Sequence, residues 1–154
     1  MKHNWKISLI FAALLTIFVA YPAYSVKYDK SNPTKMYSKA YKMIDKGQFS
    51  KAQKILKNYT KSLPNDSDGW TLLAFTYRKL EKYQASEESY VKALNIDPEN
   101  KSALEYQGEL FVETNRLDQA NINVGKLQKL CPESCTELEK LESYITNSTS
   151  KSNI

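Results

Sequence analysis

A period of 34 residues runs through most of this sequence and constrains its fold more than any other feature. Pro64, Pro98 and Pro132 are spaced by that interval. Large and small apolar positions share the spacing: Met36, Trp70 and Leu104; Met43, Tyr77 and Phe111; Phe49, Tyr83 and Leu117; Ala52, Ser86 and Ala120; Leu56, Tyr90 and Val124. A period of this length, with two helical patterns in each copy, predicts helix pairs that stack into a solenoid.

Short polar residues that can cap a helix N-terminus follow the same period. Asn32, Asp66, Asn100 and Ser134 each precede a helical run, and Ser134 with Glu137 has the spacing of a capping box. Capping and packing therefore agree on three copies, at residues 33–66, 67–100 and 101–134. The predicted helices are residues 33–46 and 50–62, 67–80 and 84–96, and 101–114 and 118–130.

A seventh helix is predicted after the third copy. Within residues 135–146, Leu138, Leu141 and Ile145 recur at helical spacing, so this helix would cap the apolar flank of the last pair. The polar tail at residues 147–154 has a composition typical of disorder.

The middle copy resembles the tetratricopeptide repeat family. The resemblance rests on eight positions: Trp70, Leu73, Ala74, Tyr77, Tyr83, Tyr90, Ala93 and Pro98. It implies an all-α fold, a right-handed superhelix of three helix pairs over residues 33–134 plus the capping helix. Trp70 is expected to be the largest contributor to its core. The outer copies diverge, as end repeats do: Lys39 and Gln107 stand where Leu73 stands, and in the middle copy Ser86 replaces the usual alanine.

The first 25 residues have the pattern of a bacterial signal peptide. A basic start is followed by an apolar run of 15 residues, Ile7 to Tyr21, and by small residues at Ala23 and Ser25. Cleavage after Ser25 would leave a short leader, residues 26–32, and a periplasmic protein. The alternative is a retained membrane anchor at residues 7–21, although a bilayer span needs about 17 to 25 residues.

Charge and composition exclude several functions. Export would remove Lys2 and Lys6 and lower the net charge from +5 to +3, which is too mild for nucleic-acid binding. We interpret the lysines as scattered residues on the solvated faces of helices. The only membrane contact expected is through the transient signal peptide. Export would also remove His3, the single histidine. Without a histidine, a glycine-rich phosphate loop or a metal-ligand cluster, we expect no enzyme activity, cofactor or metal.

The family resemblance also implies a binding site. In tetratricopeptide repeat proteins the first helix of each pair lines a concave groove that holds peptides. The matching positions here are Tyr37, Tyr41, Phe75, Arg78, Lys79, Glu105, Tyr106, Glu109 and Glu113. The aromatic members suit an extended or helical peptide, or they pack between helices; the sequence leaves both interpretations open.

Three glutamates on one helix face also allow two interpretations. Glu105, Glu109 and Glu113 lie at i, i+4 and i+8, where like charges repel. Either Arg78 and Lys79 on the neighbouring helix neutralise them, or they bind a basic segment of a protein partner.

Cys131 and Cys135 are the only cysteines. In an exported chain, two cysteines four residues apart across a turn favour a structural disulfide. The spacing does not match thiol oxidoreductases, haem attachment or a zinc site. The sequence thus predicts a periplasmic module that binds a segment of another envelope protein. The alternative function is a thiol-disulfide assembly factor acting through these two cysteines.

Overall fold

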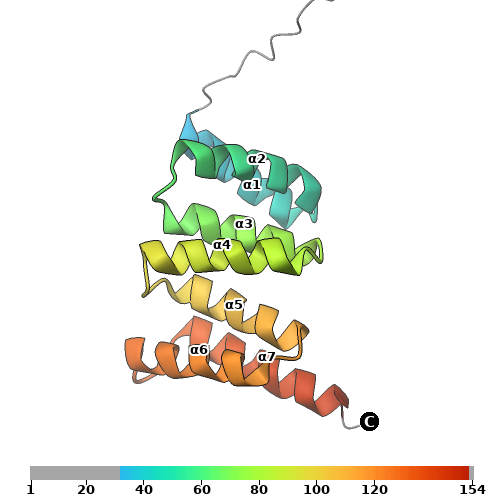
Figure 1. The fold of residues 1–154 in the computed structure, drawn as a ribbon, viewed down its shortest axis with the longest axis vertical. Coiled ribbons are helices and arrows are strands. Elements are labelled where there is room, and N and C mark those ends of the chain that lie inside the picture. Colours follow the sequence, from blue (N-terminus) through green and yellow to red (C-terminus); the bar gives the residue numbers. More distant parts are fainter. Residues whose placement is uncertain (1–31, 153–154) are drawn as a thin grey trace, which may run out of the picture. The chain divides into compact units, whose positions relative to one another are not determined.

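The computed structural model describes residues 32–152, and Figure 1 shows their fold. The predicted signal peptide, most of the leader and residues 153–154 lie outside the described residues. Within this range the chain forms seven helices and no strand. They are α1 (Pro33–Asp45), α2 (Phe49–Ser62), α3 (Ser67–Lys79), α4 (Tyr83–Ile96), α5 (Lys101–Glu113), α6 (Leu117–Leu130) and α7 (Thr136–Ser152). The all-α fold of three helix pairs and a capping helix is confirmed.

The helices stack in chain order. α1 packs on α2, α3 on α4, and α5 on α6; α2 contacts α3, α4 contacts α5, and α7 covers α5 and α6. Fully buried small residues lie where helices approach closely, at Ala52, Ser86 and Ala120. The Ser86 hydroxyl donates to the Ala74 carbonyl at 2.8 Å, so a serine is tolerated at this alanine position.

Side-chain capping follows the predicted period for three of the four residues. Asn32 accepts from the Thr34 amide at 3.0 Å, Asp66 from the Asp68 amide at 3.0 Å, and Asn100 from the Ala103 amide at 2.9 Å. The capping box at Ser134 was a wrong prediction. The hydroxyl of Ser134 donates instead to the Glu139 carboxylate at 2.7 Å, because α7 begins later, at Thr136.

Trp70 lies at the edge of the core and not at its centre. Its ring is only partly buried, its Nε1 donates to the Pro64 carbonyl at 2.8 Å, and the Lys92 ammonium lies 4.5 Å from the ring centroid. The largest fully buried side chains in the described part of the chain are Arg78 and Tyr90. A leucine position in the third copy is also polar: Gln107 is buried and accepts from the Asn123 amide at 3.0 Å.

The last helix is longer than predicted. α7 continues past residue 146 to Ser152, so the expectation of disorder was wrong for residues 147–152. Composition misleads here because the Thr149 hydroxyl donates to the Ile145 carbonyl at 3.2 Å and the Ser150 hydroxyl to the Thr146 carbonyl at 2.9 Å. Ile145 packs on the core, and a helix anchored in this way extends at little further cost.

Candidate functional site

Four aromatic side chains lie on the first helices of the three pairs. Tyr37 and Tyr41 come from α1, Phe75 from α3 and Tyr106 from α5; we call them the aromatic row. The Phe75 and Tyr106 rings are 5.0 Å apart between centroids, which joins α3 to α5. Tyr41 is 52% exposed, whereas the other three are half-buried. The row therefore both packs between helices and exposes ring surface to solvent.

Burial keeps the hydroxyls of Tyr37 and Tyr106 neutral. Burial raises the pKa of Tyr37, with Asp68 adding to the effect, and burial also raises the pKa of Tyr106, next to Glu105. Lys79 is exposed, and its ammonium lies 5.5 Å from the Phe75 ring centroid. The row thus offers apolar ring faces, hydroxyl donors and one exposed cation.

Arg78 was predicted to line the groove, and the structure corrects that placement. Its side chain is fully buried and forms ion pairs with Glu109 and, at 2.9 Å, with Glu113. The Tyr144 hydroxyl of α7 donates to the same Glu113 carboxylate at 2.8 Å. Arg78 therefore neutralises two of the three glutamates from inside the protein, while Lys79 lies over Phe75.

The buried guanidinium has an unusual surrounding. Arg78 Nε and the Tyr90 hydroxyl find no hydrogen-bond partner among the described residues. Burial acts to lower the pKa of Arg78, but the nearby Tyr90, Glu109 and Glu113 outweigh it and the pKa is raised. Two effects raise the pKa of Tyr144 to about 12: burial is the larger, and the hydrogen bond to Glu113 is the next largest. This cluster of Arg78, Tyr90, Glu109, Glu113 and Tyr144 ties α3, α4, α5 and α7 together.

Glu105 is also not available to a partner. The residue is 2% exposed, and its closest cation is Lys140 of α7, at 4.0 Å. Burial raises the pKa of Glu105 to about 7; Lys140 opposes this shift, and Glu109 and Glu137 add to it. The prediction that Glu105 contacts a basic segment is wrong because α7 covers this part of α5.

Replacing Glu105 by glutamine should remove a pH dependence of stability. Between pH 4.5 and about 7 the folded chain holds a proton that the unfolded chain has released, so the free energy of unfolding falls as pH rises. At pH 8, Glu105→Gln should therefore be more stable than the parent by roughly 1 to 3 kcal/mol. At pH 4 the difference should vanish. Urea melts at both pH values measure it, with exposed Glu99→Gln as the matched control. Equal pH profiles for the parent and Glu105→Gln would contradict the assignment.

An open hollow of about 380 Å³ lies between α5 and α7. It is lined by Glu109, Thr136, Glu139, Lys140, Ser143, Tyr144 and Asn147. Sequence reasoning missed all the α7 residues in this hollow. The 34-residue period would have found them, since Lys140 follows Tyr106, and Ser143 follows Glu109, at that spacing.

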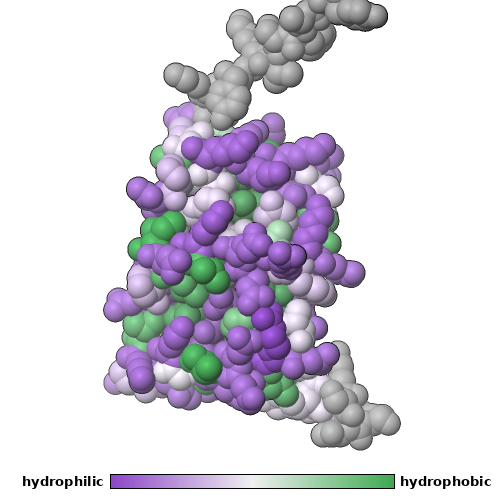
Figure 2. Space-filling model, viewed as in Figure 1, coloured by the Kyte–Doolittle hydropathy of each residue, from purple (hydrophilic) through white to green (hydrophobic). Residues whose placement is uncertain are grey.

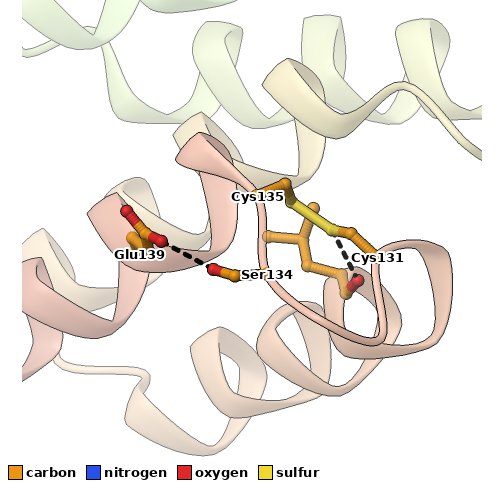
Figure 3. The surroundings of a disulfide bond; sticks show 5 residues. Cys131, Ser134, Cys135 and Glu139 are labelled. Carbon is orange, nitrogen blue, oxygen red and sulfur yellow. Dashed lines mark hydrogen bonds between the residues drawn. A yellow bond between two sulfur atoms is a disulfide. The ribbon is translucent and has the colours of Figure 1, made fainter.

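Cys131 and Cys135 flank the turn between α6 and α7 (Figure 3). Their Cα atoms are 5.9 Å apart and a disulfide joins them in the structure. Cys131 is 9% exposed and belongs to the apolar cluster beneath α7.

No group of three or more His, Cys, Asp or Glu side chains in residues 32–150 is arranged to hold a metal ion. Nor is any helix in the described part of the chain long and apolar enough to cross a membrane.

Comparison with known proteins gives both a sequence match and structural matches. Residues 67–100 match a tetratricopeptide repeat family model. Among curated proteins, no sequence matches. The type III secretion translocator chaperone SycD of Yersinia enterocolitica is similar in structure, with a TM-score of 0.68, 17% identity, and 79% of this chain and 95% of that chain covered.

Two similar structures contain peptides. SycD in complex with a peptide of the translocator YopD has a TM-score of 0.67 and 17% identity, over 77% of this chain and 93% of that chain. The first tetratricopeptide repeat domain of Spaghetti (RPAP3), bound to an HSP90 peptide, has a TM-score of 0.68 and 16% identity, over 82% and 97%. Identities this low establish the fold alone. The chain thus carries a tetratricopeptide repeat at residues 67–100 and has the fold of tetratricopeptide repeat proteins.

Proposed function

We propose that this protein is a non-enzymatic interaction module that binds a segment of another protein along the aromatic row. The observation that carries the proposal is the row itself: ring surfaces from α1, α3 and α5 follow one another, and Tyr41 is 52% exposed. SycD and Spaghetti, which share the fold, have been solved with bound peptides. Aromatic side chains supply much of the binding energy at such surfaces.

The charges around the row would select the partner. Lys79 flanks Phe75, and the hollow beyond Tyr106 carries Glu109, Glu139 and Lys140. We propose that Glu109 and Glu113, but not Glu105, contact a basic segment of the partner. The side chains of Glu109 and Glu113 are 13% and 23% exposed. Such a segment would share these carboxylates with Arg78.

The proposed location is the periplasm, after cleavage behind Ser25. Support comes from the sequence pattern of residues 1–25, and a retained anchor at residues 7–21 is the alternative. In that compartment we propose that the Cys131–Cys135 bond is structural and fixes α7 against α6, because Cys131 is packed in the apolar cluster beneath α7. Two free thiols in the accumulated protein, counted after denaturation, would overturn the structural role.

The binding proposal is tested by photo-crosslinking in intact producing cells. A photoreactive residue placed at Tyr41 should give a discrete adduct with one protein. The same residue at Ile122 of α6, which is 58% exposed and lies outside the row, serves as the matched control and should not give that adduct. Mass spectrometry then identifies the crosslinked segment of the partner.

The identified segment allows a quantitative check. A synthetic peptide of that sequence should bind the purified protein, and Phe75→Ala should weaken binding by roughly 10-fold or more. Lys126→Ala, an exposed change on α6, should leave the dissociation constant unchanged. The same adduct from both positions, or peptide binding that does not respond to Phe75→Ala, would refute the proposal.

A further inference from the structure

Among the described helices, the excess positive charge lies in the first pair. Residues 33–66 contain eight lysines, against Asp45 and Asp66, for a net charge of +6. Residues 67–154 contain 10 basic and 14 acidic residues, for a net charge of −4. The expectation of scattered lysines is therefore wrong. The eight are Lys35, Lys39, Lys42, Lys46, Lys51, Lys54, Lys57 and Lys61, and we call them the basic end.

Three of the eight lysines of the basic end lie where a preceding repeat would pack. Lys35, Lys39 and Lys42 form one stripe on α1, and each is exposed. The residues 34 positions later, Gly69, Leu73 and Thr76, are buried. So are those another 34 positions on: Ala103, Gln107 and Leu110. The lysine stripe thus marks the α1 end of the described stack, where these repeat positions are exposed.

The α2 lysines extend this surface around the end of the stack. Lys51, Lys54, Lys57 and Lys61 lie three or four residues apart on α2, so they share one side of the helix, and all are exposed. Figure 2 shows largely hydrophilic side chains where α1 and α2 lie, whereas hydrophobic side chains gather lower in the view, over α4 and α5.

Among the described residues, the positive charges of the basic end have no ion-pair partner. The ion pairs of the described residues involve Arg78, Arg116 and Lys140, and none includes a lysine of α1 or α2. The Lys51 ammonium donates to the Gln48 side-chain oxygen at 3.1 Å, a neutral partner. A solubilising end needs polar residues but not a single sign of charge. Eight cations without an ion-pair partner among residues 32–152 favour an anionic binding partner.

We propose that the basic end docks on an anionic phospholipid membrane surface. Lysines spread over two helix faces, without a cavity that would enclose a single ligand, suit a diffuse array of headgroups. Leu63, which follows α2 and is 38% exposed, lies beside Lys61 in the chain and adds an apolar contact at the interface. In the sequence, α1 is preceded by Lys30, Lys27 and the apolar run of residues 7–21. This docking uses a different surface from the aromatic row and does not depend on the proposed peptide binding.

Vesicle flotation tests the proposal. The protein is purified from the cells that express it, in the form in which it accumulates there. The parent should float with vesicles of about three parts phosphatidylglycerol to seven parts phosphatidylcholine, bind pure phosphatidylcholine far less, and lose the difference at about 0.5 M salt. Lys35→Gln/Lys39→Gln/Lys42→Gln should weaken binding to the anionic vesicles by about 10- to 100-fold. The matched control is Lys101→Gln/Lys126→Gln/Lys129→Gln, which removes the same charge from exposed positions of α5 and α6 and should change binding by less than about 3-fold.

Three other outcomes of the vesicle experiments would overturn the proposal. An equal loss in both triple variants would mean that net charge alone governs binding, and equal flotation with both vesicle types would assign binding to the apolar N-terminal run. If the parent binds a polyglutamate peptide or DNA but no vesicle, the basic end serves an acidic macromolecule instead. Circular dichroism verifies that each variant is folded. Crosslinking from Tyr41 should persist in the α1 triple variant, so a failure of membrane docking is distinguishable from a failure of peptide binding.

Discussion

Arg78→Ala is expected to lower the free energy of unfolding by about 3 to 5 kcal/mol, a large part of the roughly 5 to 15 kcal/mol that stabilises a domain. The guanidinium is fully buried and pairs with Glu109 and Glu113. Its removal leaves two carboxylates facing each other at the α5–α7 junction, without the cation that neutralises them. A cavity also opens beside the fully buried Tyr90 ring. Urea denaturation followed by circular dichroism measures the change.

The neighbouring residue provides a control for this prediction. Lys79→Ala removes the same charge one position along α3, but Lys79 is exposed and forms no ion pair with the glutamates in the described structure. Its effect should stay within about 0.5 kcal/mol. Arg78→Ala with Glu109→Gln and Glu113→Gln should recover part of the lost stability, because no uncompensated charge is then left. A loss below about 1 kcal/mol for Arg78→Ala would mean that the cluster does not hold the helices together.

Leu141→Ala should cost about 2 to 5 kcal/mol and release α7 from the stack. The Leu141 side chain is fully buried and lies directly over Gly108 of α5. A Cβ added at Gly108 would come within 2.5 Å of Leu141 Cδ2, so Gly108→Ala should also be destabilising. Hydrogen exchange of the α7 amides, together with urea melts, measures both effects.

A double-mutant cycle separates this contact from general damage. The smaller side chain in Leu141→Ala makes room for the methyl group of Gly108→Ala. The loss of stability in the double variant should therefore be smaller than the sum of the two single losses, by about 1 kcal/mol or more. Ser143→Ala, an exposed change on α7, is the control and should be nearly neutral. Strict additivity would show that Gly108 and Leu141 do not form the α5–α7 contact.

The 34-residue period predicted the helices well because packing and capping depend on local spacing. Ala52, Ser86 and Ala120 are buried as predicted, and the three caps at Asn32, Asp66 and Asn100 form. These features repeat with the chain, so a single sequence displays them several times.

The candidate site was less predictable, since it depends on what covers each first helix. Arg78 and Glu105 occupy groove positions in the repeat pattern, but Glu109, Glu113 and the docked α7 bury them. The sequence marks α7 as an amphipathic helix without showing how far it covers α5. The length of α7 was missed for a related reason: Asn, Ser and Thr were interpreted by composition, whereas hydroxyl-to-carbonyl bonds fit them into a helix.

The separation of charge along the chain gives the folded stack a permanent electric dipole. Its positive pole is at α1 and α2, and the negative charge lies in the later helices. In the field above an anionic layer such a molecule turns before it touches the layer, with the positive pole leading. The protein would then be oriented before it contacts the layer. The surface formed by Phe75 and Tyr106 would face along the layer and would be accessible to another molecule that diffuses on it.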